Sequence, residues 1–375
     1  MRKRTTKVAR GKLRVTMFFS FHRHLPVHAR HLGCLAAALA LNLCGLVVLA
    51  QERTIAATHV SPEPALGETH SRVLFGREAF FYDGPIPYWS DGYLISTKTE
   101  SFSPGTPNVI LLGRNGSKSA EVSFWFPGSQ RVVITSAALS HHGGVLASGE
   151  ADKADGTRAF FIAFANSNGQ VTNVVQTGNF HPRDVCEAPD GSIWAFGGMM
   201  WDTVKRERLA GNVLRRFDLK KGETASFVPG SVFPPKMQAD EASHIRCTSE
   251  AVFVYSNPAN MLIELPYKAE APQIYDVSRP EGLEVITFAV IGPHEMYGGL
   301  ASLGADNGKG GMYTLAVDEK AGSGHWQPVK GTVGRFTDEA TVSSVWGFDE
   351  GNLVISRGGD PAGITALHWV SVSPR

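Results

Sequence analysis

The sequence beyond residue 50 lacks the short motifs that mark common nucleotide-binding and catalytic folds. It contains no GxGxxG turn, no P-loop, no GxSxG elbow and no HExxH helix motif. The glycine-rich run at 306–311 does not have P-loop spacing and is typical of a hairpin loop. No activity therefore follows from a local motif, and any indication of function must come from the fold and from clusters of polar residues.

Acidic side chains are absent from residues 1–50, which carry nine Lys/Arg. An 18-residue uncharged stretch, Gly33 to Ala50, follows the basic block, and this order is typical of a secretory signal with cleavage after Ala50. The stretch is also long enough to span a bilayer as a helix of about 27 Å, so a retained membrane anchor at residues 33–50 is the alternative. Met17 is an alternative start. We expect an exported protein, periplasmic or extracellular, whose hydrophobic helix lies outside the folded domain.

Positive charge is also scarce after the basic block, since residues 51–375 carry 27 basic and 35 acidic side chains, a net charge of −8. An acidic domain repels nucleic acid, which excludes it as an expected partner. Residues 51–70 are polar and proline-containing, as in a linker. We therefore expect one domain over 71–375, in contact with a membrane only through the N-terminal segment.

Long stretches without a glycine or proline are few, because the chain holds 40 glycines and 21 prolines. This composition favours short strands and turns over helices and predicts an all-β fold. The clearest unit is the segment from Asp184 to Gly198, which reads as two strands around the turn Pro189-Asp190-Gly191.

Weaker copies of this hairpin recur along the chain. The second residue of each second strand falls near a period of 50, at positions 94, 146, 194, 253, 297 and 354. Third and fourth apolar runs follow most copies, as in the four-stranded blades of a β-propeller. We predict six blades, with five or seven as alternatives. The last copy has three strands, and the segment Ser71 to Ala79 is expected to supply the fourth and close the ring.

The turn Pro189-Asp190-Gly191-Ser192-Ile193-Trp194 resembles the DGxIW turn of six-bladed propellers of the virginiamycin-lyase and NHL type. The resemblance is partial at Asp91-Gly92 and at Glu350-Gly351-Asn352. It implies the propeller fold. The group includes lyases, lactone hydrolases and binding modules, so the resemblance does not imply one reaction.

Polar clusters precede several of the predicted innermost strands, where ligands of propellers usually bind. The candidate channel-face residues are His181, Asp184, Asp240, Glu241, His244, Asp338 and Glu339. Converging carboxylates would suit Ca²⁺ or Mg²⁺, and a set mixed with histidine would suit a transition metal. The alternative is that these residues are solvated turn formers and that the protein requires no cofactor.

Two further groups of residues have alternative interpretations. Cys186 and Cys247 are either buried thiols or a disulfide, which export would permit. Met199-Met200-Trp201 either forms a binding rim or covers a blade edge.

Three hypotheses of function follow. The first is an exported monomeric propeller that binds a protein, peptide or glycan through its loop face, without catalysis. The second is a metal-dependent lyase or hydrolase that acts at the central channel, and the third is a structural component of the cell envelope.

Overall fold

The computed structural model describes residues 87–114, 117–202, 204–233, 243–292, 295–302, 308–335, 341–349, 352–357 and 367–371. The chain divides into two compact units, Met1–Gln51 and Glu52–Arg375, and every described residue belongs to the second. The expected signal or anchor, the linker at 51–70 and the closing strand at 71–79 lie outside the described residues. Among the described residues, no helix has both the length and the apolar character needed to cross a membrane.

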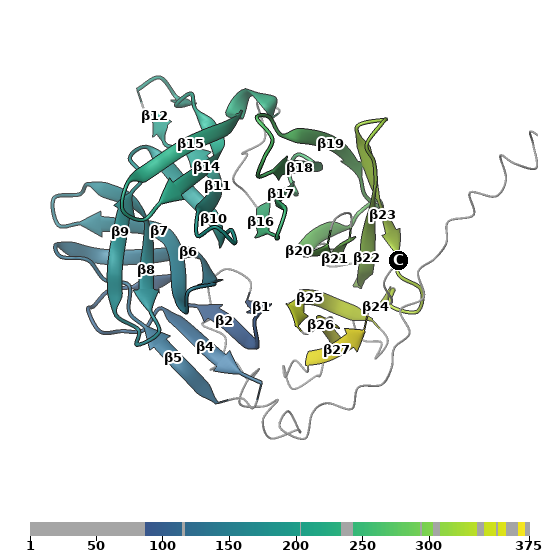
Figure 1. The fold of residues 1–375 in the computed structure, drawn as a ribbon, viewed down its shortest axis with the longest axis horizontal. Helices are drawn as coiled ribbons and strands as arrows, with labels where there is room; N and C mark the ends of the chain where they lie inside the picture. Colours follow the sequence, from purple (N-terminus) through teal and green to yellow (C-terminus); the bar gives the residue numbers. More distant parts are fainter. Residues whose placement is uncertain are drawn as a thin grey trace, which may run out of the picture. The chain divides into compact units, whose positions relative to one another are not determined.

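The second unit is built from β-strands. The described residues contain no α-helix and one short 3₁₀ turn, η2 (Gly230–Val232). The prediction of an all-β fold with a propeller-like arrangement is confirmed (Figure 1).

Antiparallel meanders follow one another along the chain. The first comprises β1 (Tyr88–Ser90), β2 (Tyr93–Thr97), β4 (Val109–Gly113) and β5 (Lys118–Val122). The second comprises β6 (Ser129–Ser140), β7 (Gly144–Lys153), β8 (Arg158–Asn166) and β9 (Val171–Gln176), with β3 (Glu100–Ser101) paired to β6. The third comprises β10 (Phe180–Glu187), β11 (Ile193–Met199), β14 (Asn212–Asp218) and β15 (Gly222–Pro229).

The later meanders repeat this order. One comprises β16 (Ser243–Cys247), β17 (Ala251–Ser256), β18 (Met261–Pro266) and β19 (Gln273–Ser278). The next comprises β20 (Glu284–Gly292), β21 (Glu295–Ala301), β22 (Lys309–Asp318) and β23 (Ser323–Pro328), with β24 (Gly334–Arg335) paired to β22. The last described one comprises β25 (Val342–Asp349), β26 (Asn352–Arg357) and β27 (Leu367–Ser371). A separate hairpin, β12 (Trp201–Asp202) and β13 (Glu207–Arg208), extends from the third.

The meanders are arranged around a circle. Their first strands contact one another in the order β6, β10, β16, β20, β25 and β1, and β2 of the first meander contacts β6. β1 pairs in parallel with β25 through Trp89 and Gly347, so the first and last meanders meet (Figure 1). This order places the first strand of each meander innermost, around a central channel.

The hydrophobic core consists of separate clusters between neighbouring meanders. Strand β11 shows why, because its side chains alternate between two clusters. Trp194 and Phe196 pack toward β16 and β17, whereas Ile193 and Ala195 pack toward β7 and β8. Each large side chain buried in this way contributes about 1.5–3 kcal/mol. A meander with two apolar faces is stable only between two neighbours.

The hairpin of β10 and β11 has the turn chemistry that the sequence predicts. Gly191 has a φ of +79°, and the Asp190 carboxylate accepts hydrogen bonds from the backbone N–H and hydroxyl of Ser192. The register pairs Cys186 with Trp194 and is shifted by a bulge between Pro182 and Asp184.

Candidate functional site

A cavity of about 710 Å³ lies among the first strands of the meanders. Residues of β1, β6, β10, β16, β20 and β25 line it. Strand β2 also reaches the cavity through Ile95 and Thr97, next to the three-residue β1. The cavity is therefore the axial channel of the ring, and its wall combines apolar side chains with a limited set of polar groups.

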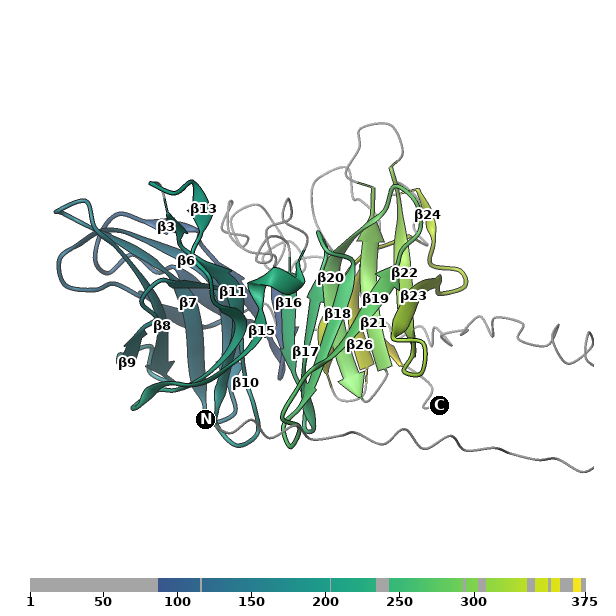
Figure 2. The same cartoon turned by 90° about the horizontal axis from the view of Figure 1, so that it is seen from above.

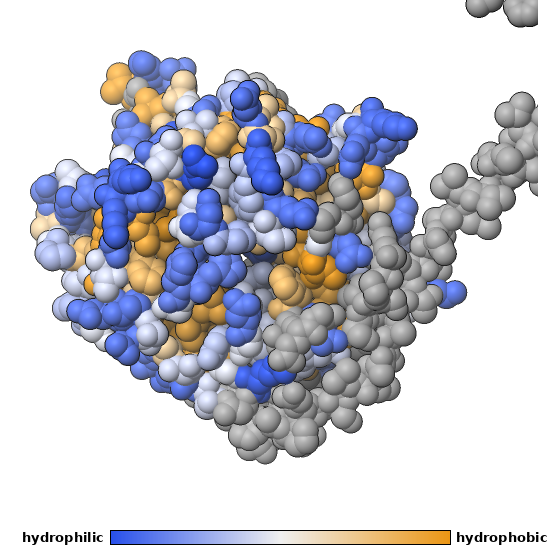
Figure 3. All heavy atoms as spheres, in the orientation of Figure 1, coloured by the Kyte–Doolittle hydropathy of each residue, from blue (hydrophilic) through white to orange (hydrophobic). Residues whose placement is uncertain are grey.

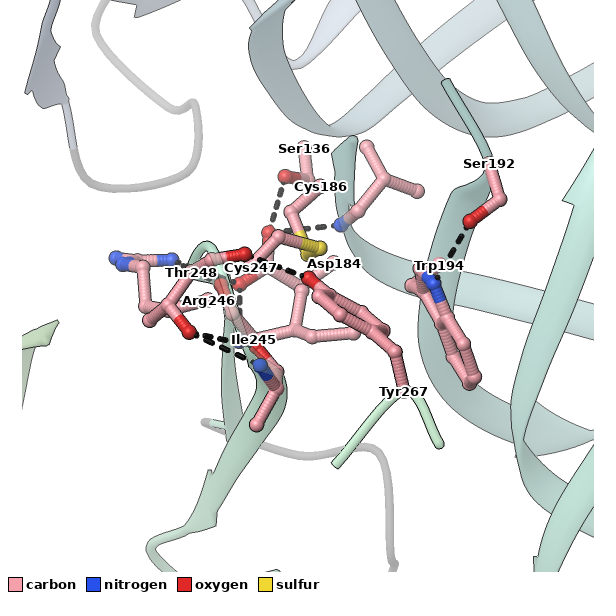
Figure 4. The surroundings of a disulfide bond; sticks show 12 residues. Ser136, Asp184, Cys186, Ser192, Trp194, Ile245, Arg246, Cys247, Thr248 and Tyr267 are labelled. Atoms are coloured by element: carbon pink, nitrogen blue, oxygen red, sulfur yellow. Dashed lines mark hydrogen bonds and ion pairs between the residues drawn. A yellow bond between two sulfur atoms is a disulfide. The ribbon is translucent and has the colours of Figure 1, made fainter. Parts of the chain in front are cut away.

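Asp184 joins three neighbouring first strands in the cavity wall (Figure 4). Its Oδ1 accepts hydrogen bonds from the Ser136 hydroxyl on β6 and from the backbone N–H of Val185 at 3.0 Å. Its Oδ2 accepts one from the backbone N–H of Ile245 at 2.9 Å and lies 3.4 Å from Nη1 of Arg246. With both oxygens engaged, this carboxylate is suited to fixing the wall and not to proton transfer.

Arg246 on β16 is held in one orientation. Its Nε donates to the carbonyl oxygen of Phe288 at 2.9 Å, and its Nη1 donates to that of Ile245 at 2.6 Å. The guanidinium carbon lies 4.2 Å from the ring centroid of Tyr88, a cation–π distance. Burial raises the pKa of the Tyr88 phenol, so the ring stays neutral beside the cation.

His244 lies in the same wall, two residues before Arg246. Burial, and secondarily the charge of Arg246, lowers its pKa to about 3. The imidazole is therefore uncharged at physiological pH and can bind a ligand only as a neutral donor or acceptor.

The disulfide Cys186–Cys247 joins β10 to β16 and lines the cavity (Figure 4). The two Cα atoms lie 5.7 Å apart, within the range of a bridge, because the two first strands are in contact. The structure thus differs from the alternative of two separate thiols. Neighbouring first strands approach more closely here than sequence spacing alone indicates.

Two threonine hydroxyls beside β2 have unused hydrogen-bonding capacity. Thr97, only 5% exposed, and Thr99 both line the cavity, and their Oγ1 atoms are buried. Neither oxygen has a hydrogen-bond partner within the described part of the chain. Leaving a buried polar group unpaired costs about 1–3 kcal/mol, which favours pairing with a ligand or with water. Because each oxygen is buried, this pairing requires the threonine side chain to rotate toward the cavity.

A buried carboxylate, Glu187, lies at the end of the cavity where β10 turns into β11. Its Oε2 accepts a hydrogen bond from the backbone N–H of His141 at 2.7 Å. Its Oε1 lies 3.9 Å from Nε2 of the exposed His142, beyond hydrogen-bond distance. Asp91, in the turn between β1 and β2, also lines the cavity.

The candidate residues from the sequence are only partly brought together. Asp184 and His244 share the cavity wall, whereas His181 lies between β10 and β8, stacked on Phe160 with ring centroids 4.3 Å apart. Burial lowers the pKa of His181 to about 3, with smaller effects from Arg183, Arg158 and Arg208.

The other candidate residues, Asp240, Glu241, Asp338 and Glu339, lie outside the described residues, so the expected metal site remains a prediction. Within the described residues there is no group of three or more potential metal-ligating side chains.

Sequence reasoning missed Arg246, Thr97 and Thr99. Arg246 carried a signal, since it follows His244 at a spacing of two, which keeps both side chains on one face of a strand. The threonines carried none, because β2 reaches the channel only where β1 is short.

Comparison with known proteins gives similarity of fold only. No family model and no curated protein sequence matches the chain. A solved structure of a protein described as exported, from Bacteroides fragilis, aligns at 8% identity and a TM-score of 0.46, over 79% of this chain and 92% of that one. The structure of a glucose dehydrogenase aligns at 12% identity with a TM-score of 0.42, over 78% of this chain and 99% of the dehydrogenase chain. A third similar structure is a GH43 β-xylosidase/α-arabinofuranosidase from a compost metagenome in complex with xylotriose. It aligns at 12% identity with a TM-score of 0.39, over 66% of this chain and 94% of that one.

The functional expectation from the sequence is corrected at this point. It favoured an exported interaction module without catalysis, whereas the similar structures that are named for an activity are a dehydrogenase and glycosidases. The interaction module is not proposed further. Turn residues and net charge indicate the scaffold and the position of its channel, but they do not indicate which side chains line the cavity there. Identities of 8–12% with TM-scores of 0.39–0.46 carry neither a family nor a reaction to this chain.

Proposed function

We propose that the protein is an enzyme that acts on a carbohydrate held in the axial cavity. The observation that carries this proposal is the axial cavity of about 710 Å³, whose wall combines apolar side chains with hydroxyl and carboxylate groups, among them the hydroxyls of Thr97 and Thr99, which have no partner among the described residues. A sugar hydroxyl both donates and accepts hydrogen bonds, so it can pair with a threonine hydroxyl in either sense.

The remainder of the wall supports a ligand of this class. A volume of about 710 Å³ falls within the range of roughly 300–1,000 Å³ of small-molecule sites. A sugar ring has apolar C–H faces and a polar rim. Ile95, Val133 and Val345 offer apolar contacts, while Ser243 and the threonines offer polar ones.

Hydrolysis of a glycosidic bond is the reaction that the cavity carboxylates favour. The reaction needs one carboxylic acid that protonates the leaving oxygen and one carboxylate that activates water or attacks the sugar. Asp91 and Glu187 line the cavity, and Glu187 keeps one oxygen outside hydrogen-bond distance of its neighbours. We assign these two residues to acid–base chemistry on the ground that both line the cavity, a role that requires their carboxyl groups to lie about 5–9.5 Å apart, and we assign Asp184 to the wall.

The test is release of nitrophenol from a panel of nitrophenyl glycosides. We expect turnover of at least one member. Thr97→Val and Thr99→Val should raise KM about three- to tenfold, the effect of one lost hydrogen bond. Glu187→Gln and Asp91→Asn should lower kcat by about 10²-fold or more. Thr172→Val, on the exposed face of β9, is the matched control. No turnover of any glycoside, together with no thermal shift by any sugar, would refute the proposal.

We also propose that the ring has six blades, with innermost strands β1, β6, β10, β16, β20 and β25, and that residues 1–50 direct export. The pairing order and the contacts between first strands support six blades. The basic block followed by an uncharged stretch supports export. Amino-terminal sequencing of secreted protein checks the second proposal, since a mature chain that begins with Gln51 is expected.

A further inference from the structure

The hairpin of β12 and β13 forms a sheet of its own that is separate from every meander. Trp201 pairs with Arg208 and Asp202 pairs with Glu207. Its base is tied to the domain, because the N–H of Met200 donates to the Asn179 carbonyl at 2.8 Å. The hairpin extends beyond the sheet of β10, β11, β14 and β15 (Figures 1 and 2). It is thus an anchored projection.

Apolar side chains on this projection are exposed. Trp201 is 53% exposed, Val204 in the turn is 90% exposed, and Met200 at the base is 36% exposed. Of the segment Met199-Met200-Trp201, Met199 packs against the core cluster beside β11, as expected of a residue that covers a blade edge, whereas Met200 and Trp201 remain exposed. An exposed group of large apolar side chains on a soluble domain marks a contact with another surface.

Two cations share the turn with the exposed valine. Lys205 and Arg206 directly follow Val204, and both are exposed. Figure 3 shows apolar surface next to strongly hydrophilic surface where β12 projects. Residues 201–208 carry three basic and two acidic side chains, a net charge of +1, whereas residues 51–375 as a whole carry −8, so the hairpin is a local exception. An anionic surface would be repelled by most of the domain and attracted at this point.

We propose that the hairpin of β12 and β13 docks on an anionic phospholipid bilayer through Trp201, Val204, Lys205 and Arg206. The geometry assigns Trp201 and Val204 to the boundary between headgroups and acyl chains, where tryptophan is enriched in membrane proteins. Lys205 and Arg206 would contact lipid phosphates. A protein partner fits less well, since a stable interface needs about 800 Å² per partner. The other large apolar side chains that the described residues expose lie on other elements, namely Phe102, Val174, Val333 and Phe348. This inference is independent of the proposed enzymatic function.

Tryptophan fluorescence of the full chain tests the proposal. The protein has seven tryptophans, all beyond residue 50, so the N-terminal segment adds no signal of its own. Vesicles of phosphatidylcholine with phosphatidylglycerol, carrying bromine on the acyl chains, should shift the emission to the blue and quench part of it. Vesicles of phosphatidylcholine alone should do so much less.

Variants identify the contact. Trp201→Phe should lose most of the quenching, which shows that Trp201 is the residue in contact with lipid. Val204→Ser should weaken binding, and the pair Lys205→Gln with Arg206→Asn should weaken binding to the anionic vesicles by about tenfold or more. Asn suits position 206 because Arg206 has a φ of +56°. Phe102→Ser, which removes an equally exposed side chain on another loop, should bind like the wild type. Absence of quenching in the wild type, or equal quenching in Trp201→Phe, would overturn the proposal.

Discussion

Asp184 and Arg246 form an ion pair across two neighbouring first strands, with 3.4 Å between Oδ2 and Nη1 and both side chains 15% exposed. The pair closes a network that runs from Ser136 on β6 through Asp184 on β10 to Ile245 and Phe288. One carboxylate therefore sets the relative position of the strands that form this side of the cavity.

Asp184→Asn should destabilise the fold by about 2–3 kcal/mol, because it leaves a largely buried guanidinium without its counter-charge. The midpoint and slope of urea unfolding measure the change. Asp190→Asn is the matched control, since Asp190 is exposed and holds only its own turn. An effect of Asp184→Asn no larger than that of the control would show that the network is not stabilising.

Removal of the disulfide by Cys186→Ala and Cys247→Ala should lower the free energy of unfolding by about 4 kcal/mol, for a separation of 61 residues. The loss reflects the larger conformational entropy of an unfolded chain without the cross-link. Urea unfolding of the wild type with a reductant should give the value of the double variant. A wild type that does not respond to reductant, with a variant of equal stability, would contradict this account.

As the pH decreases from about 6.5 to about 3, the free energy of unfolding should decrease because of the titration of His181. Its folded-state pKa is about 3, below the ordinary 6.5, so the unfolded state binds the proton first as pH decreases. At pH 5 the loss attributable to this residue should be roughly 1–2 kcal/mol. The raised pKa of the neighbouring Glu150, caused by burial, acts in the opposite direction, since protonation favours the folded state there.

His181→Phe isolates the effect, because phenylalanine keeps the stacking on Phe160 and cannot titrate. As the pH decreases from 7 to 4, the melting temperature of the wild type should decrease more than that of the variant. A difference that stays constant over this range would show that His181 does not titrate on unfolding.

Gly347→Ala should disrupt the contact between the first and last meanders. A Cβ at this position would lie 2.0 Å from the carbonyl oxygen of Trp89, its pairing partner, and the φ of +137° is unsuited to alanine. We expect a loss of about 2–4 kcal/mol in urea unfolding. Gly105→Ala is the control, with positive φ but open space around the Cβ, and should cost about 1 kcal/mol. Equal losses would argue against ring closure through this pair.

Sequence alone predicted the scaffold better than the site. Residues 94, 146, 194, 253, 297 and 354 all lie on second strands, because turn chemistry and alternation of apolar residues are local signals. The site could not be predicted in the same way. The bulge between Pro182 and Asp184 interrupts the alternation of β10, and the short β1 lets β2 line the channel. Both features depend on how distant strands meet, which no local pattern encodes.

The most direct test of the central claim is a crystal structure of the protein with the sugar that gives turnover or a thermal shift. The account predicts that the sugar occupies the axial cavity, with hydroxyl oxygens within hydrogen-bond distance of Oγ1 of Thr97 and Oγ1 of Thr99. A sugar bound on the outer surface, with both threonine hydroxyls paired to other protein groups, would contradict it.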